Sequence, residues 1–145
     1  MPQENVDAAR RLFKAVEERD LAGVLAVYDP DVVICEAASL LYGGVYHGLE
    51  GALRHASGYA KAWAALQTPA DMSTDPVFLD AGEYAVVLWR QRGSASDGRK
   101  LDMPAVNIYK MRDGKIVESQ VFHADTKAIL QFLDGEKPNR TTFPN

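Results

Sequence analysis

The sequence has a single cysteine, Cys35, no long hydrophobic run and no excess of basic residues. One cysteine excludes an intramolecular disulfide and fits a reducing compartment. The chain has 20 acidic and 16 basic residues and a net charge of −4, so nothing in its charge favours nucleic acid or an anionic membrane. No segment has the roughly 20 apolar residues of a membrane span. The first seven residues lack the basic and apolar regions of a signal peptide. We therefore expect a cytoplasmic protein that contacts neither nucleic acid nor membrane.

The chain also lacks repeats, low-complexity linkers and a second compositional unit. Its 145 residues are enough to bury one core without disulfides or metals. Apolar periodicity ends near Gly135, and the segment that follows contains two prolines. We predict a single domain over residues 1–135 and a tail over residues 136–145.

Apolar spacing and turn residues predict the order of helices and strands. Helices are expected over residues 6–16, 20–28 and 49–66, with Leu49 and Leu53 among the buried side chains, and a last helix follows Asp125. Strands are expected over residues 32–36, 45–47, 72–79, 83–94, 101–112 and 115–123. Asp113-Gly114 predicts a two-residue hairpin turn, because both positions of a type I′ turn need positive φ.

This order predicts an α+β fold in which helices cover one face of a mostly antiparallel sheet. Strands of about ten residues over so few helices must curl, because sheets twist. A curled sheet closed at one end by helices forms a cone, and the open end of a cone is a pocket.

Three segments resemble the SnoaL-like polyketide cyclase family: DLAGVLAVYDPDV (20–32), YGGVYHGLEG (42–51) and RDGKIVE (112–118). This family lies in the nuclear transport factor 2-like superfamily together with ketosteroid isomerase and limonene-epoxide hydrolase. The resemblance extends over residues 4–133 and implies a cone-shaped, cystatin-like sheet wrapped around N-terminal helices. It also implies a two-fold homodimer paired through the outer sheet face. If Asn107, Tyr109 and Val117 face the cone, then Leu88, Val106 and Ile108 lie on that outer face. One cone in this superfamily hosts isomerases, hydrolases, dehydratases, cyclases and binding proteins.

The comparison with ketosteroid isomerase places its general base at Glu36. A carboxylate in an apolar pocket has a raised pKa and can move a proton on a carbon acid. A strand-end Glu can equally face solvent or pair with an arginine. The hydrogen-bonding acid of the isomerase falls at Asn107, whose amide can donate to an oxyanion. The isomerase's tyrosine falls at Leu12, which has no donor, so steroid isomerisation is disfavoured.

The comparison with the cyclases and the epoxide hydrolase instead places an acid/base or water-activating group at Asp125. Alternation along a strand would put His123 and Asp125 on one face. Asp before a helical run is also a favoured N-cap, so capping is the competing interpretation. His123 is a candidate base near neutral pH or a packing residue. The additional arginine and aspartate of the hydrolase have no clean counterparts on the second long strand, which carries Trp89, Arg90, Gln91 and Arg92 there, so epoxide hydrolysis is disfavoured.

The remaining site predictions concern the walls of the pocket and bound groups. No recognised ligand spacing joins His47, Glu118, His123 and Asp125, so we expect no metal and no cofactor. Aromatic side chains are mostly core residues, but a cone of this type would place several of them around a flat, hydrophobic ligand. The predicted pocket-lining residues are Tyr28, Tyr42, Tyr59, Trp63, Trp89 and Tyr109.

Two classes of function follow from these residues. The first is a small cofactor-independent enzyme that cyclises, isomerises or dehydrates a hydrophobic carbonyl compound, with Asp125 or Glu36 as acid/base, His123 tuning it and Asn107 holding an oxygen. The second is a non-catalytic module that binds a hydrophobic small molecule or docks a partner. Carboxylates that reach the pocket favour the enzyme, and carboxylates held in caps or surface ion pairs favour the binding module.

Overall fold

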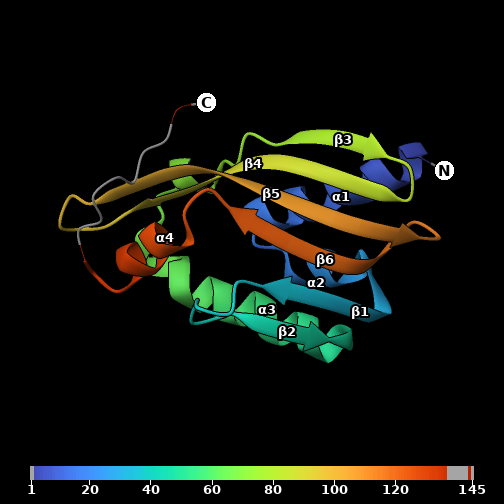
Figure 1. Cartoon of the computed structure of the whole chain (residues 1–145), viewed down its shortest axis with the longest axis horizontal. Helices are drawn as coiled ribbons and strands as arrows, with labels where there is room; N and C mark the ends of the chain where they lie inside the picture. Colours follow the sequence, from blue (N-terminus) through green and yellow to red (C-terminus); the bar gives the residue numbers. More distant parts are fainter. Residues whose placement is uncertain (1, 137–143, 145) are drawn as a thin grey trace.

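A computed structural model describes residues 2–136 and residue 144 of the chain (Figure 1). The helices are α1 (Pro2–Glu17), α2 (Leu21–Ala26), α3 (Gly48–Trp63) and α4 (Thr126–Leu133), with 3₁₀ turns at η1 (Ala64–Leu66) and η2 (Ala70–Met72). The strands are β1 (Tyr28–Glu36), β2 (Gly44–His47), β3 (Val77–Ala81), β4 (Tyr84–Ser94), β5 (Lys100–Arg112) and β6 (Lys115–His123). Most of the predicted tail, 137–143 and 145, lies outside the described residues. No helix in the described part is long and apolar enough to cross a membrane.

The strands form one open sheet in the order β2-β1-β6-β5-β4-β3. The pairing of β1 with β6 is parallel, and the other neighbours pair antiparallel. Figure 1 shows α1, α2 and α3 on one side of this sheet, with α4 beside the end at which β6 stops. Leu12 and Phe13 of α1 and Ala52 of α3 pack with Val87 and Ile116 of the sheet in the larger core cluster. The predicted α+β class is confirmed.

The predicted Asp113-Gly114 hairpin turn is also confirmed. Both residues have positive φ, 52° and 72°. The turn joins β5 to β6 with Arg112 opposite Lys115, so it fixes the register of the two strands.

The strand predicted over residues 72–79 is wrong in its first half. Strand β3 begins at Val77, and the preceding chain forms the 3₁₀ turn η2. Asp75 has a φ of +47°, and Pro76 has no N–H to donate to a ladder. The apolar pattern continues across Asp75 and Pro76, but strand pairing with β4 begins only at Val77.

Two helix predictions also need correction. The helix expected to reach Tyr28 ends at Ala26, and β1 starts at Tyr28 rather than at Val32. Leu49 and Leu53 were expected to be buried on α3 but are each 40% exposed. The inward stripe of α3 instead passes through Ala52 and Trp63, so the two leucines lie off it.

The outer face of the sheet carries an exposed apolar row across four strands. Val77 pairs with Leu88, Leu88 with Val106, and Val106 with Phe122. Val77, Leu88 and Phe122 are exposed. Val117, expected to face the cone, instead lies on this outer side beside Lys110 and Glu118. The cause is a β-bulge: Ile116 and Glu118 pair with the consecutive residues Met111 and Lys110, which leaves Val117 without a ladder partner.

We expect the chain to form a homodimer through this row, because an isolated protomer would expose it to water. Sedimentation at micromolar concentration should give one species of twice the monomer mass. The double variant Leu88→Lys/Phe122→Lys should sediment as a monomer. The control Leu41→Lys changes a leucine outside the sheet that is even more exposed, and this variant should remain dimeric. A wild-type protein of monomer mass would refute this arrangement.

Candidate acid–base site

A cavity of about 330 Å³ lies between α1, α3 and the sheet. Its volume lies within the range of sites that bind small organic molecules. All six aromatic side chains predicted for the pocket line it: Tyr28, Tyr42, Tyr59, Trp63, Trp89 and Tyr109. Glu36, Asn107 and His123 also line it, whereas Asp125 does not.

The cavity holds a carboxylate between two histidines. Glu36 Oε2 lies 2.9 Å from His55 Nε2, and Glu36 Oε1 lies 3.6 Å from His123 Nε2. The Glu36 side chain is 5% exposed and that of His123 is 2% exposed. Glu36 ends β1 and His123 ends β6, and the parallel pairing of these strands brings their ends together. We call Glu36, His55 and His123 the His-Glu-His cluster.

Sequence reasoning did not identify His55. The side chain comes from α3, four residues before Tyr59, and both residues face the cavity. A polar residue on the inward face of a helix was the available signal. Its partner Glu36 lies on another element, so that the pairing itself could not be seen in a local pattern.

The histidines reverse the direction expected for the pKa of Glu36. Burial alone would raise this pKa, but the nearby His123, together with the hydrogen bond and charge of His55, outweighs burial and lowers it. The raised pKa predicted for a carboxylate in an apolar pocket is therefore wrong here. Glu36 is an ionised group near neutral pH.

The ionised state of Glu36 determines where the proton lies on His55. A carboxylate only accepts hydrogen bonds, so Nε2 of His55 donates to it and Nδ1 is unprotonated in the neutral ring. In His123, both ring nitrogens are buried, and neither has a hydrogen-bond partner among the described residues. The edge of Trp89 packs against the His123 ring at a centroid distance of 6.2 Å and restricts its orientation.

Acidification should remove the stability that ionised Glu36 contributes. Because the folded state lowers this pKa below its ordinary value of 4.5, the contribution is complete above that pH and is lost as pH falls through the folded pKa. The difference in free energy of unfolding between the wild type and Glu36→Gln should change as the pH falls below the ordinary pKa of 4.5. The exposed Glu50→Gln protein is measured alongside as the comparison for a surface carboxylate. A difference for Glu36→Gln that stays constant below this pH would contradict the lowered pKa.

Asn107 is held between two aromatic residues. Trp89 Nε1 donates to Asn107 Oδ1 at 2.8 Å, and Asn107 Nδ2 donates to the Tyr109 hydroxyl at 2.6 Å. The indole can only donate, so it fixes which way the amide points. Burial, the main cause, raises the pKa of Tyr109 well above its ordinary value and keeps the hydroxyl protonated. The Tyr109 hydroxyl accepts the amide hydrogen, and its own hydrogen is available to a bound oxygen.

Asp125 is the N-cap of α4. Its Oδ1 accepts from the backbone N–H of Ala128 at 3.0 Å. The strand alternation that would align it with His123 does not extend so far, since β6 ends at His123. The structure thus places Asp125 in the capping geometry and brings Glu36, His123 and Asn107 together without it.

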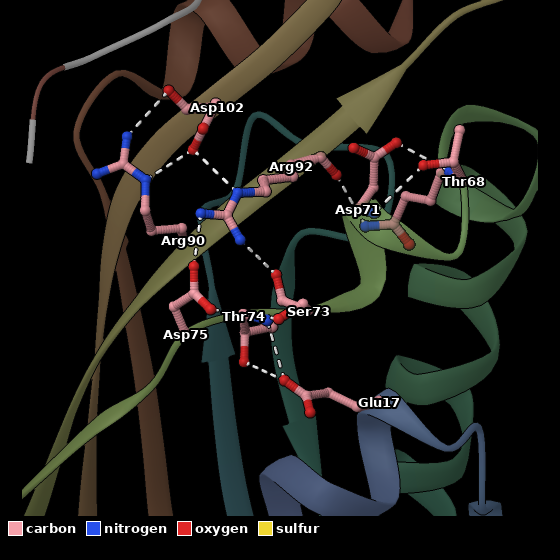
Figure 2. A network of polar contacts seen from close by, with 10 residues as sticks. Glu17, Thr68, Asp71, Ser73, Thr74, Asp75, Arg90, Arg92 and Asp102 are labelled. Carbon is pink, nitrogen blue, oxygen red and sulfur yellow. Dashed lines mark hydrogen bonds and ion pairs between the residues drawn. The ribbon is translucent and has the colours of Figure 1, made fainter.

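The segment over residues 67–75 forms another part of the cavity wall and is tied down by the polar network in Figure 2. Thr74 donates to Glu17 through both its N–H and its hydroxyl. Arg92 binds Asp75 at 2.7 Å and donates to the carbonyl of Ser73. Figure 2 also shows Arg90 paired with Asp102, 2.6 Å away. Arg90 and Arg92, both on β4, are therefore held in ion pairs.

No metal centre is evident in the part of the chain that the structure describes. Within it, no group of three His, Cys, Asp or Glu side chains is arranged to hold a metal ion.

Comparison with solved structures identifies the same architecture in other proteins. An NTF2-like protein of unknown function from Burkholderia pseudomallei is 25% identical, with a TM-score of 0.76 over 90% of this chain and 97% of that chain. TerC, crystallised with polyporic acid, is 21% identical, with a TM-score of 0.77 over 90% of this chain and 98% of that chain. A Sinorhizobium meliloti protein provisionally described as a polyketide cyclase is 18% identical, with a TM-score of 0.61 over 80% of this chain and 94% of that chain.

No curated protein matches the sequence. The family model described as a SnoaL-like domain matches residues 9–119, which include β1, α3 and most of the sheet. The family resemblance noted in the sequence is confirmed, and the chain belongs to the SnoaL-like domain family of the NTF2-like superfamily.

Proposed function

We propose that the chain is an acid–base enzyme that moves a proton on a hydrophobic carbonyl compound held in the cavity. The His-Glu-His cluster carries this proposal: an ionised, buried carboxylate contacts two imidazoles inside an apolar, aromatic-lined cavity. Burying an ionised carboxylate costs free energy unless the carboxylate is fully hydrogen-bonded, so one that is not points to a chemical role. Glu36 Oε1 and both nitrogens of His123 have no hydrogen-bond partner among the described residues.

In the proposed reaction His123 is the base and Glu36 is its charged partner. With Nε2–H directed at Glu36, Nδ1 of His123 takes a proton from the carbon next to the carbonyl. The C–H electron pair forms the new C=C bond, and the carbonyl electrons move to the oxygen. The Glu36 charge then faces an imidazolium, so that the cluster passes from net negative to neutral as it accepts the proton. His55 holds Glu36 in place through its 2.9 Å contact.

The enolate oxygen needs a hydrogen-bond donor, which the Tyr109 hydroxyl can provide. Return of the proton from His123 to a different carbon gives isomerisation. Attack of the enolate carbon on a second carbonyl, with the proton on His123 passing to the new alkoxide, gives cyclisation. Loss of a hydroxyl group from the neighbouring carbon, which leaves as water with the same proton, gives dehydration. The cluster serves each of these outcomes, and the shape of the substrate selects among them.

A non-catalytic ligand-binding module is the second candidate. The capping role of Asp125 and the internal hydrogen bonds of Asn107 favour it, because they remove two of the predicted acid–base groups from free contact with a ligand. The structural neighbour TerC, crystallised with polyporic acid, supports an organic ligand in either case.

Deuterium exchange separates the two candidates without knowledge of the natural substrate. Purified protein in D₂O is mixed with a panel of bicyclic ketones such as 2-tetralone and 1-indanone, and loss of the proton next to the carbonyl is followed by NMR. The enzyme should accelerate exchange of ketones that it binds. Binding of panel members with exchange no faster than in buffer would establish the binding module instead.

A further inference from the structure

Gln91 is a buried polar residue that the proposed reaction does not use. It lies on β4, lines the cavity and is 1% exposed. Its Oε1 accepts from the Tyr59 hydroxyl at 3.2 Å, and its Nε2 is buried with no partner among the described residues. Buried amide groups are nearly always hydrogen-bonded in folded proteins, so an unpartnered amide at a cavity wall points to a ligand.

The position of Gln91 relative to the His-Glu-His cluster follows from α3. His55 contacts Glu36, and Tyr59, four residues further along the same helix, contacts Gln91. Four residues of α-helix rise by about 6 Å. The cavity therefore has two polar regions about one helical turn apart, and Tyr42 and Trp63 are among the aromatic residues of its wall.

We infer that Gln91 binds a second oxygen of the substrate through Nε2. The inference rests on the proposed function, which places the reacting carbonyl of the substrate at the His-Glu-His cluster. The substrate class is then a flat aromatic or polycyclic compound with two oxygen substituents on opposite sides of its ring system, rather than a simple monofunctional ketone. Gln91 is a specificity-determining residue, since it contacts the substrate away from the proton transfer.

Three bicyclic probes that differ only in oxygen content test this inference: naphthalene, 1-naphthol and 1,5-dihydroxynaphthalene. Their dissociation constants are measured by fluorescence titration of the wild type, Gln91→Met and the control Gln120→Met. Methionine keeps the length of the side chain and removes the amide, and Gln120 is exposed on the other face of the sheet.

In the wild type and in Gln120→Met, the second hydroxyl should tighten binding by about tenfold over 1-naphthol, the scale of one buried hydrogen bond. In Gln91→Met, this gain should disappear while naphthalene binds as before. The prediction holds whichever polar region the single hydroxyl of 1-naphthol prefers. A second hydroxyl tightens binding only when each of the two polar regions can hold one oxygen. A tenfold gain retained in Gln91→Met, or no gain in the wild type, would overturn the inference.

Two further measurements keep the result interpretable. Ketone exchange measures the proposed reaction, whereas the naphthalene series measures binding alone, so a failure of the proposed reaction and a failure of the Gln91 contact are distinguishable. If Gln91→Met does not fold, the side-chain amide resonances of the wild type provide the test. One glutamine NH₂ pair should shift with 1,5-dihydroxynaphthalene and stay in place with naphthalene, and equal shifts with both probes would contradict the contact.

Discussion

Replacing His123 by Asn or Glu36 by Gln should slow enzyme-catalysed ketone exchange by at least about 100-fold, the scale of lost general acid–base catalysis. Asparagine removes the base from the cavity wall. Glutamine keeps the shape of Glu36 but cannot carry the charge that stabilises the imidazolium. Both variants should still bind the ketone, because the aromatic walls of the cavity are unchanged. The measurement is the exchange rate at saturating ketone, with affinity measured separately.

Asp125→Asn is the matched control for these two variants. Asparagine caps helices about as well as aspartate, so the folded state should be preserved. Exchange should also be preserved, because Asp125 does not line the cavity. Loss of exchange in a folded Asp125→Asn protein would restore the acid/base role that the family resemblance implied for Asp125. Full exchange in Glu36→Gln would end the carboxylate mechanism.

The fold could be predicted where local chemistry determines the backbone. Positive φ at Asp113 and Gly114 follows from the residues themselves, and α1 and α3 follow from apolar spacing. Apolar periodicity alone places the start of β3 too early, because it takes no account of Pro76, which has no N–H for the ladder. The exposure of Leu49 was missed for a different reason: a helix with many apolar residues has more than one possible inward face, and tertiary packing selects among them.

The site could be predicted only in part, because its chemistry depends on contacts between distant segments. Glu36 and Asn107 were found by position in the resembling family, and the aromatic wall by residue type. His55 and Gln91 were not found, because the role of each depends on a hydrogen bond to a residue of another element. The pKa of Glu36 shows the consequence most clearly. Burial alone gives the wrong direction, and the histidines that reverse it come from α3 and the end of β6.

Trp63→Ala should lower the free energy of unfolding by about 3–5 kcal/mol, which is a large part of the stability of a small domain. Trp63 is the last residue of α3 and is 1% exposed. Its ring stacks on Phe132 of α4 at 6.0 Å, and its Nε1 donates to the Tyr42 hydroxyl at 3.0 Å. Alanine would remove the contact that joins α3 to α4 and would leave the Tyr42 hydroxyl without its donor.

Two variants separate the contributions of size and hydrogen bonding to this loss, with urea unfolding followed by circular dichroism. Trp63→Phe keeps an aromatic ring against Phe132 but loses the N–H, so it should cost about 1–2 kcal/mol. Leu53→Ala, on the same helix and 40% exposed, should cost less than about 1 kcal/mol. The expected order is therefore Trp63→Ala, Trp63→Phe and Leu53→Ala. Equal losses for Trp63→Ala and Leu53→Ala would mean that Trp63 does not join α3 to α4, because a surface side chain and a central packing residue cannot cost the same.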